Sequence, residues 1–411
     1  MQAMRRRVIV GLLLLVGGVW LLGSAEAKGP IKIGFIYPDS GPFAQVGIDM
    51  RDGFSLYLAE VGNKAGGRAI ELVFETKGTN KPDEGLTKAR KLVERDRVHI
   101  LAGLVATPVA VAMRSYVVSQ KVPFMLTIAA ANDLTQKLRS EYIFRSSWSG
   151  SQNGHPLGDW AYKQGYRKAV IVASDYGAGH EMIGGFARVF TEAGGQVIQE
   201  LYPPVGAPDF APYLTQVRRD ADVVAVFFGG SDALRFVNQY AEYGLKGKIP
   251  LVGPVAVTDE TVLPRQGDNA LGIVTTHPWS AALDTPGNKR FFKAYEARHQ
   301  RAPTLGSETG YAGAQMIAQA LEAIKGNIEN KEAFLAALEK VEVDAPRGKV
   351  RLDAYHNPIE TVYVRKVERK DGALQNSVID SYPNVSQFWK WSPEAHMAMP
   401  GYQEMKGKWA R

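Results

Sequence analysis

Short apolar runs alternate with amphipathic stretches along this chain, and the whole alternation occurs twice. The predicted strands of the first series are 31–37, 70–75, 99–104 and 123–128, and those of the second are 169–173, 196–202, 222–228 and 250–255. Stretches with helical periodicity separate them, at 47–61, 83–95 and 108–119 and then at 180–193, 210–219 and 232–243. Strands joined by helices in this way form βαβ units and parallel sheets. The predicted fold class is therefore α/β, with two doubly wound parallel-sheet lobes in succession.

The later segments must be added to these two lobes, so we expect a hinge that the chain crosses several times. Segments 288–299 and 310–324 have helical periodicity, and 348–353 with 360–368 indicate a hairpin. The predicted division is 28–148 plus about 279–347 for lobe 1 and 149–278 plus about 348–384 for lobe 2. The segment 385–411 is expected to lie over the surface as a tail, because its aromatic residues would be a solubility liability if left exposed.

The first 27 residues have the order of parts that a secretory signal peptide requires. Arg5–Arg7 are followed by the apolar run 8–22 and by Ala25-Glu26-Ala27, a small-x-small cleavage site. The apolar run is shorter than the roughly 20 residues that span a bilayer. The chain contains no cysteine, so it offers no thiol for a lipid anchor, a disulfide or a thiolate metal site. We expect a mature chain from Lys28 that is periplasmic, soluble and unlipidated.

Composition and motifs argue against nucleic-acid binding and against catalysis. Without the signal region the chain has 46 basic and 41 acidic residues, a net charge of +5, with no basic run interleaved with aromatics. No Gly-x-Ser-x-Gly elbow or Walker loop is present, and His180-Glu181 lacks the second histidine of a zinc motif. We therefore predict no enzyme, no metal and no cofactor. A hydrolase with a dispersed site and a sensory ligand-binding subunit remain as alternatives.

Several strand-end motifs, taken together in their order and spacing, resemble one family. They are the segment 33–47 with its Ser-Gly-Pro loop, 82–93, 122–131, Phe144-Arg145, Asp175-Tyr-Gly177 and 209–213. Over essentially the whole mature chain they resemble the exported solute-binding proteins of ABC transporters, of the branched-chain amino-acid type. The resemblance implies a type I periplasmic binding protein fold, a small ligand held between two closing lobes and a permease partner in the inner membrane. We expect the protein to be a monomer.

In that family the loops of lobe 1 hold the carboxylate of the ligand. The matching positions are Thr107 and the backbone of Ala129, Ala130 and Ala131. Backbone N–H groups and a hydroxyl at a helix N-terminus can stabilise an anion without a buried counter-charge. Thr107 could alternatively serve as a plain N-cap. Further ligand contacts are expected from the opening loop and from lobe 2, at Phe43, Tyr176 and Ser231.

The departures from the family concern the ammonium group. Amino-acid binders hold it with a hydroxyl and a carboxylate, where this chain has Ala131 and Val255. A buried ammonium without anionic partners costs several kcal/mol. Unless Asp232 or Asp259 substitutes, the ligand should have a carboxylate and no amine. Trp148 and His277 could offer an aromatic face and an imidazole, or could instead pack at the hinge.

The tail resembles those of a subgroup associated with aromatic carboxylates from plant phenolics, through the segment 385–393. Together with the missing ammonium partners, this resemblance points to a benzoate- or cinnamate-like acid, which suits an anion cradle next to stacking surfaces. The alternative ligand is a branched-chain or other aliphatic amino acid.

Overall fold

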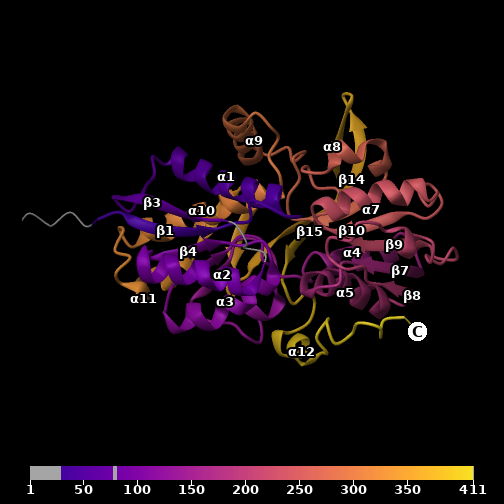
Figure 1. Cartoon of the computed structure of the whole chain (residues 1–411), viewed down its shortest axis with the longest axis horizontal. Coiled ribbons are helices and arrows are strands. Elements are labelled where there is room, and N and C mark those ends of the chain that lie inside the picture. Colours follow the sequence, from indigo (N-terminus) through magenta and orange to yellow (C-terminus); the bar gives the residue numbers. More distant parts are fainter. Residues whose placement is uncertain (1–28, 77–80, 411) are drawn as a thin grey trace, which may run out of the picture.

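Two helix-covered β-sheets follow one another along the chain (Figure 1). The structure is a computed structural model that describes residues 29–76 and 81–410, so the predicted signal peptide lies outside the described residues. Each sheet has a parallel core whose strands are joined by helices, as the repeated pattern predicts. The architecture is that of a type I periplasmic binding protein fold.

The first sheet contains six strands, and all neighbours except β2 and β3 are parallel. Its order is β2 (Lys64–Ala65), β3 (Arg68–Glu75), β1 (Ile31–Ile36), β4 (Ile100–Gly103), β5 (Phe124–Leu126) and β6 (Ile143–Arg145). The connecting helices are α1 (Ala44–Glu60), α2 (Pro82–Arg90), which continues into a π turn, and α3 (Thr107–Ser119). Strands β1 and β4 are apolar and buried almost throughout, as expected for strands covered on both faces.

The second sheet is larger and mixed. Its parallel part has the order β8 (Gln196–Leu201), β7 (Lys168–Ala173), β9 (Val223–Phe227), β10 (Leu251–Pro254) and β11 (Val274–His277). Antiparallel strands extend it: β14 (Pro358–Lys370), β13 (Gly348–Leu352), β12 (Glu342–Ala345) and β15 (Ala373–Val385). The helices are α4 (Gly154–Lys163), α5 (Gly177–Glu192), α6 (Ala211–Leu214), α7 (Ser231–Glu242) and α8 (Leu263–Gln266).

After β11 the chain returns to the first sheet and then leaves it again. Helices α9 (Pro286–His299), α10 (Leu305–Ala323) and α11 (Lys331–Leu338) follow β11, and the orange α10 and α11 lie among the purple elements of the first sheet (Figure 1). Helix α10 packs tightly on α1, since a Cβ at Gly53 would collide with the backbone of Ser307. Strand β12 already belongs to the second sheet, a few residues before the predicted return at about 348.

Several elements differ from the sequence prediction. The predicted helix 210–219 is reduced to the single turn of α6, and the predicted hairpin 348–353/360–368 is present as β13 and β14. Helices α4 and α11, the short strand β6 and the long strand β15 were not predicted. No helix in the described part of the chain is long and apolar enough to cross a membrane.

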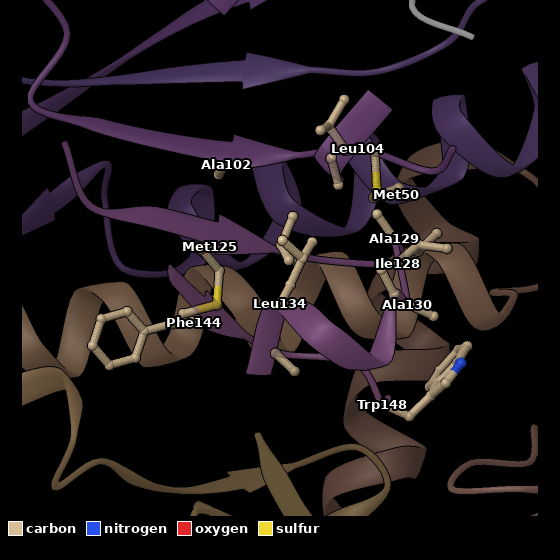
Figure 2. Packing of buried hydrophobic residues seen from close by; sticks show 14 of the residues in the cluster. Met50, Ala102, Leu104, Met125, Ile128, Ala129, Ala130, Leu134, Phe144 and Trp148 are labelled. Atoms are coloured by element: carbon tan, nitrogen blue, oxygen red, sulfur yellow. The ribbon is translucent and has the colours of Figure 1, made fainter. Parts of the chain in front are cut away.

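The core of the first sheet extends to the loops that follow its strands. Buried Met125 and Phe144 lie on β5 and β6, and Leu134 lies in the 3₁₀ turn Asn132–Thr135. Figure 2 shows Ile128, Ala129 and Ala130 on the segment after β5, with Trp148 nearby. Because this segment is itself part of the core, its position is set by packing as well as by hydrogen bonds.

The C-terminal segment lies along one side of the molecule. In Figure 1 it runs in yellow below α5, carries the short helix α12 (Pro393–Ala398) and ends near β8. Phe388 and Trp409 are buried, and Ala410 forms a parallel bridge with Val197 of β8. The aromatic residues of the segment are thereby partly or fully removed from water.

Candidate ligand-binding site

A small cavity lies where the carboxyl ends of strands from both sheets face one another. In each sheet the strand order reverses, at β3-β1-β4 and at β8-β7-β9, and such switch points are where open α/β sheets bind ligands. The cavity is lined from lobe 1 by Phe43, Val46, Val105, Thr107, Ile128, Ala130, Trp148 and Leu305, and from lobe 2 by Tyr176, Ala178, Met182, Phe227, Gly229, Gly230, Val255 and Ala256.

The lobe 1 wall combines a helix start with the loop after β5. Thr107 is the first residue of α3, and Ala106 occupies the N-cap position without a side-chain cap. The Thr107 hydroxyl instead accepts a hydrogen bond from the Ala130 N–H at 3.3 Å. The N–H groups of a first helical turn have no intrahelical acceptor and favour anions. Thr107 therefore joins the two loops at a place suited to a carboxylate, and it is not the N-cap.

Arg145 lies behind this wall and holds the loop by its carbonyl groups. The fully buried guanidinium donates to the carbonyl oxygens of Ala129 at 2.5 Å and of Ala131 at 2.8 Å. Neither alanine lines the cavity, although both were predicted site residues. Burial lowers the pKa of Arg145 to about 10, so the guanidinium remains charged at neutral pH. A positive charge is thus built in directly behind the loop.

The lobe 2 wall contains a strained residue. Val255 has a φ of +62°, a conformation that is unusual for a β-branched residue. Its N–H donates to Thr276 O at 2.8 Å, and its carbonyl accepts from the buried Arg365 at 3.1 Å. Arg365 also donates to Trp279 O at 2.8 Å. Hydrogen bonds at its N–H and at its carbonyl group maintain a backbone conformation that is unfavourable for a valine.

Glycines allow the two lobes to meet over the cavity. Gly230 has a φ of +57°, and a Cβ there would collide with the carbonyl oxygen of Pro42 in lobe 1. Gly229 faces the ring of Phe43, since a Cβ there would lie 3.7 Å from the ring. The lobes are therefore in contact across the cavity, as in a closed binding cleft.

Trp148 is the one tryptophan among the described residues that line the cavity. It is buried, and its indole N–H has no hydrogen-bond partner among the described residues. Its ring and the ring of His277 pack in a T-shaped arrangement, with their centroids 5.0 Å apart. His277 itself does not line the cavity, and burial holds its pKa well below the usual value. Ser231 begins α7 and also lies outside the lining.

The side chains that line the cavity carry no charge. Among these described residues the polar side chains are Thr107, Tyr176 and Trp148, and burial raises the pKa of Tyr176, which keeps its hydroxyl neutral. Asp232 accepts from the Gly206 N–H at 2.7 Å, and Asp259 accepts from the Leu305 N–H at 3.1 Å. Neither aspartate lines the cavity. The described residues also contain no cluster of metal-binding side chains.

Comparison with known proteins identifies the family. The periplasmic binding protein family model matches residues 30–373. The chain belongs to the periplasmic binding protein family. A similar structure is the ABC transporter substrate-binding protein from Sphaerobacter thermophilus, with 40% identity, a TM-score of 0.83, and coverage of 87% of this chain and 99% of that one.

Two further relatives of this periplasmic binding protein carry the name of a ligand in their descriptions. A solute-binding protein from Rhodopseudomonas palustris BisB5, in complex with 3,4-dihydroxy benzoic acid, is 32% identical with a TM-score of 0.83, covering 88% of this chain and 99% of that one. The Leu/Ile/Val-binding protein homolog 6 of Brucella melitensis is 32% identical over 88% of this chain and 94% of its own length. Members of the family bind small solutes for ABC transporters, work with a permease and are not enzymes.

Some of the residues that line the cavity of this periplasmic binding protein were predicted from the sequence, and others were not. The structure brings Phe43, Thr107, Ala130, Trp148, Tyr176 and Val255 into one cavity. Ser231 was predicted as a site residue, whereas Phe227 and the pair Gly229-Gly230 before it were not, although a Gly-Gly pair at a strand end indicates close backbone approach. Met182 and Leu305 lie on helices α5 and α10, and no strand-end rule points to them.

Proposed function

We propose that this protein captures a small aromatic carboxylate of the benzoate or cinnamate type in the periplasm and presents it to an ABC permease. The observation that carries the proposal is the chemistry of the cavity. An anion-binding helix start and a buried guanidinium lie at the lobe 1 wall, and no acidic side chain is present among the described lining residues.

The absence of acidic side chains from the lining argues against an amino acid. An α-ammonium buried in this cavity would find no carboxylate partner among the described lining residues, at a cost of several kcal/mol. A ligand with a carboxylate and no amine has no ammonium to bury, so its binding does not carry this cost. The Rhodopseudomonas palustris relative bound to 3,4-dihydroxy benzoic acid supports this assignment, whereas the name of the Brucella melitensis relative supports the alternative of branched-chain amino acids.

In this proposal the carboxylate lies between Thr107 and the loop at Ala130. The ring lies among the aromatic side chains of Phe43, Trp148 and Tyr176, whose faces suit stacking and edge contacts. Val255 closes the site from lobe 2. Since these contacts come from both lobes, the ligand stabilises the closed state over the open one.

The same proposal covers location and assembly. The protein acts in the periplasm after removal of residues 1–27 and without a lipid anchor, because the chain has no cysteine. It acts as a monomer, with no nucleic-acid partner. Family membership supports the periplasmic location and the permease.

A thermal-shift screen with matched ligand pairs tests the proposal. The pairs are 3-phenylpropanoate with L-phenylalanine and 4-methylpentanoate with L-leucine, which differ only in the α-ammonium, next to a panel of benzoates. Binding to the native state raises the melting temperature according to RT ln(1 + [L]/Kd). We expect shifts from aromatic acids lacking the amine. Shifts confined to the amine-bearing members would overturn the proposal in favour of an amino-acid binder.

A further inference from the structure

Besides Arg145, a second buried ionisable group contacts the loop after β5 that carries Ala130. This group is Glu181. Glu181 lies on α5 of lobe 2, and its carboxyl group accepts the backbone N–H of Asn132 of lobe 1, at 3.2 and 3.1 Å to its two oxygens. Residue 150 makes room for this carboxyl, since a Cβ at Gly150 would collide with it. No cation forms an ion pair with Glu181 among the described residues.

The segment from Ala129 to Asn132 therefore lies between two buried groups of opposite type. Arg145 of lobe 1 holds the carbonyls of Ala129 and Ala131, and Glu181 of lobe 2 holds the N–H of the next residue. Arg145 has no ion-pair partner among the described residues. The charges of Glu181 and Asp353 nevertheless act on Arg145. A ligand carboxylate at this loop would therefore share the positive charge of Arg145 with Glu181.

These two carboxylates compete electrostatically. Like charges repel strongly in a water-poor interior, and a second negative charge raises the pKa of the first carboxyl group. Burial already raises the pKa of Glu181 to about 8. An anionic ligand on the same loop should raise it further, whereas an ionised Glu181 should weaken the hold on the ligand.

We infer that capture of the anionic ligand is coupled to protonation of Glu181. When Glu181 is ionised in the ligand-free protein, it takes up one proton as the anion binds in the cavity. This inference rests on the proposed function, because it requires a carboxylate ligand. Glu181 is then a positioning residue that selects for anions by becoming neutral. It keeps its contact with Asn132 in both protonation states, since a carboxylic acid still has an oxygen that accepts the N–H.

Solvent reaches Glu181 through a separate polar cavity, which gives the proton a route. This cavity is lined by the turn after β5, by α5 and by the C-terminal segment. The titratable and charged groups that face Glu181 from these elements and from β6 are Asp133, Lys137, Arg145, Tyr176, Arg188, His396, Tyr402 and Glu404. Burial lowers the pKa of His396 to about 4 and raises that of Tyr402 to about 12, so neither titrates near pH 8.

The test is calorimetric titration with benzoate from pH 6 to pH 9, since benzoate stays ionised throughout this range. For the wild type we expect Kd to rise by roughly tenfold from pH 7 to pH 9. Glu181 ionises within this range, and once it is ionised each anion that binds must bring one proton with it. Glu181→Gln preserves the shape and the acceptor for Asn132 and should bind benzoate with a Kd that is independent of pH. The matched control Asp133→Asn removes an exposed charge from the same turn and leaves Glu181 able to titrate. Its Kd should still rise with pH, with the rise shifted to a lower pH because the charge of Asp133 raises the pKa of Glu181.

A ligand-free measurement separates the failure of this inference from that of the proposed function. A carboxyl whose folded pKa is raised makes the native state bind more protons than the unfolded state, so its stability falls as pH rises from about 4.5 to about 8. The melting temperature of the wild type relative to Glu181→Gln should fall across this window. A wild-type Kd that does not change with pH, or an equal slope in Glu181→Gln, overturns the coupling. Absence of benzoate binding at every pH overturns the proposed ligand, and the coupling with it.

Discussion

The guanidinium of Arg145 donates a hydrogen bond to the carbonyl oxygen of Ala131 at 2.8 Å, from within the core of lobe 1. The carbonyl groups of the cradle loop are therefore directed toward the protein interior. A loop whose carbonyls face inward can direct backbone N–H groups toward a ligand, and the nearby positive charge favours an anion. Arg365 has a similar relationship to Val255 in lobe 2, so each wall of the cavity has a buried arginine behind it.

Arg145→Lys should weaken ligand binding by at least about tenfold, because an ammonium cannot reproduce the planar fork that reaches two carbonyls. Titration calorimetry with an aromatic carboxylate measures the change. Arg139→Lys is the matched control, since Arg139 is exposed and donates to Ala354 O outside the cavity. An Arg145→Lys protein that folds and binds as tightly as the wild type would contradict the role of Arg145 in holding the cradle.

Thr107→Val should weaken carboxylate binding about fivefold to thirtyfold, the equivalent of roughly 1–2 kcal/mol for one hydrogen bond to a charged group. The variant keeps the shape of the side chain and removes the hydroxyl that faces Ala130. Thr107→Ser restores the hydroxyl and should restore most of the affinity. Equal affinity in all three proteins would exclude Thr107 from the cradle.

Val255→Glu should disfavour an acidic ligand, because it places a carboxylate in the cavity wall opposite the cradle. We expect the loss to exceed tenfold in Kd for an aromatic acid. Val255→Gln has nearly the same size without the charge and separates the electrostatic effect from the steric one. If both variants lose affinity equally, the charge is not responsible; if neither does, position 255 lies outside the ligand's reach.

Phe388→Ala tests how the C-terminal segment is attached. Phe388 is buried and packs against Tyr355 and His396 at ring centroid distances of 5.0 and 5.7 Å. Truncation of a buried phenylalanine costs about 3–5 kcal/mol of unfolding free energy. Urea denaturation should show this loss, whereas Val378→Ala, at an exposed position of β15, should change stability by less than about 0.5 kcal/mol. A near-zero effect of Phe388→Ala would mean that the segment is not packed as described.

The sequence predicts the two sheets well because their strands are buried on both faces and read as continuous apolar runs. Strand β15 was missed because its residues alternate poorly, are mostly exposed and include Pro383, which disfavours a strand. Helix α4 was missed because it contains Pro156 and two glycines, which disfavour a helix. In both cases tertiary contacts outweigh the local conformational preference of the sequence: β15 pairs with β14, and α4 packs against α5.

The cavity residues that were predicted lie where a helix begins shortly after a strand, as Thr107 and Tyr176 do. The supporting arginines could not be predicted, since a single arginine in a strand reads as a solvent-facing residue. Arg365 is buried next to the buried Val364 because a register shift with β15 interrupts the alternation at that point. Such an irregularity depends on the partner strand and leaves no trace in local sequence.

The most direct test of the central claim is to measure the binding of 3,4-dihydroxybenzoate and of L-leucine to the same preparation of residues 28–411 by titration calorimetry at pH 7. A cavity with an anion cradle and no acidic side chain among its described lining residues predicts saturable one-to-one binding of the aromatic acid and no heat from leucine. Saturable binding of leucine with none of the aromatic acid would contradict the account, and would show that a carboxylate reaches the ligand's ammonium after all.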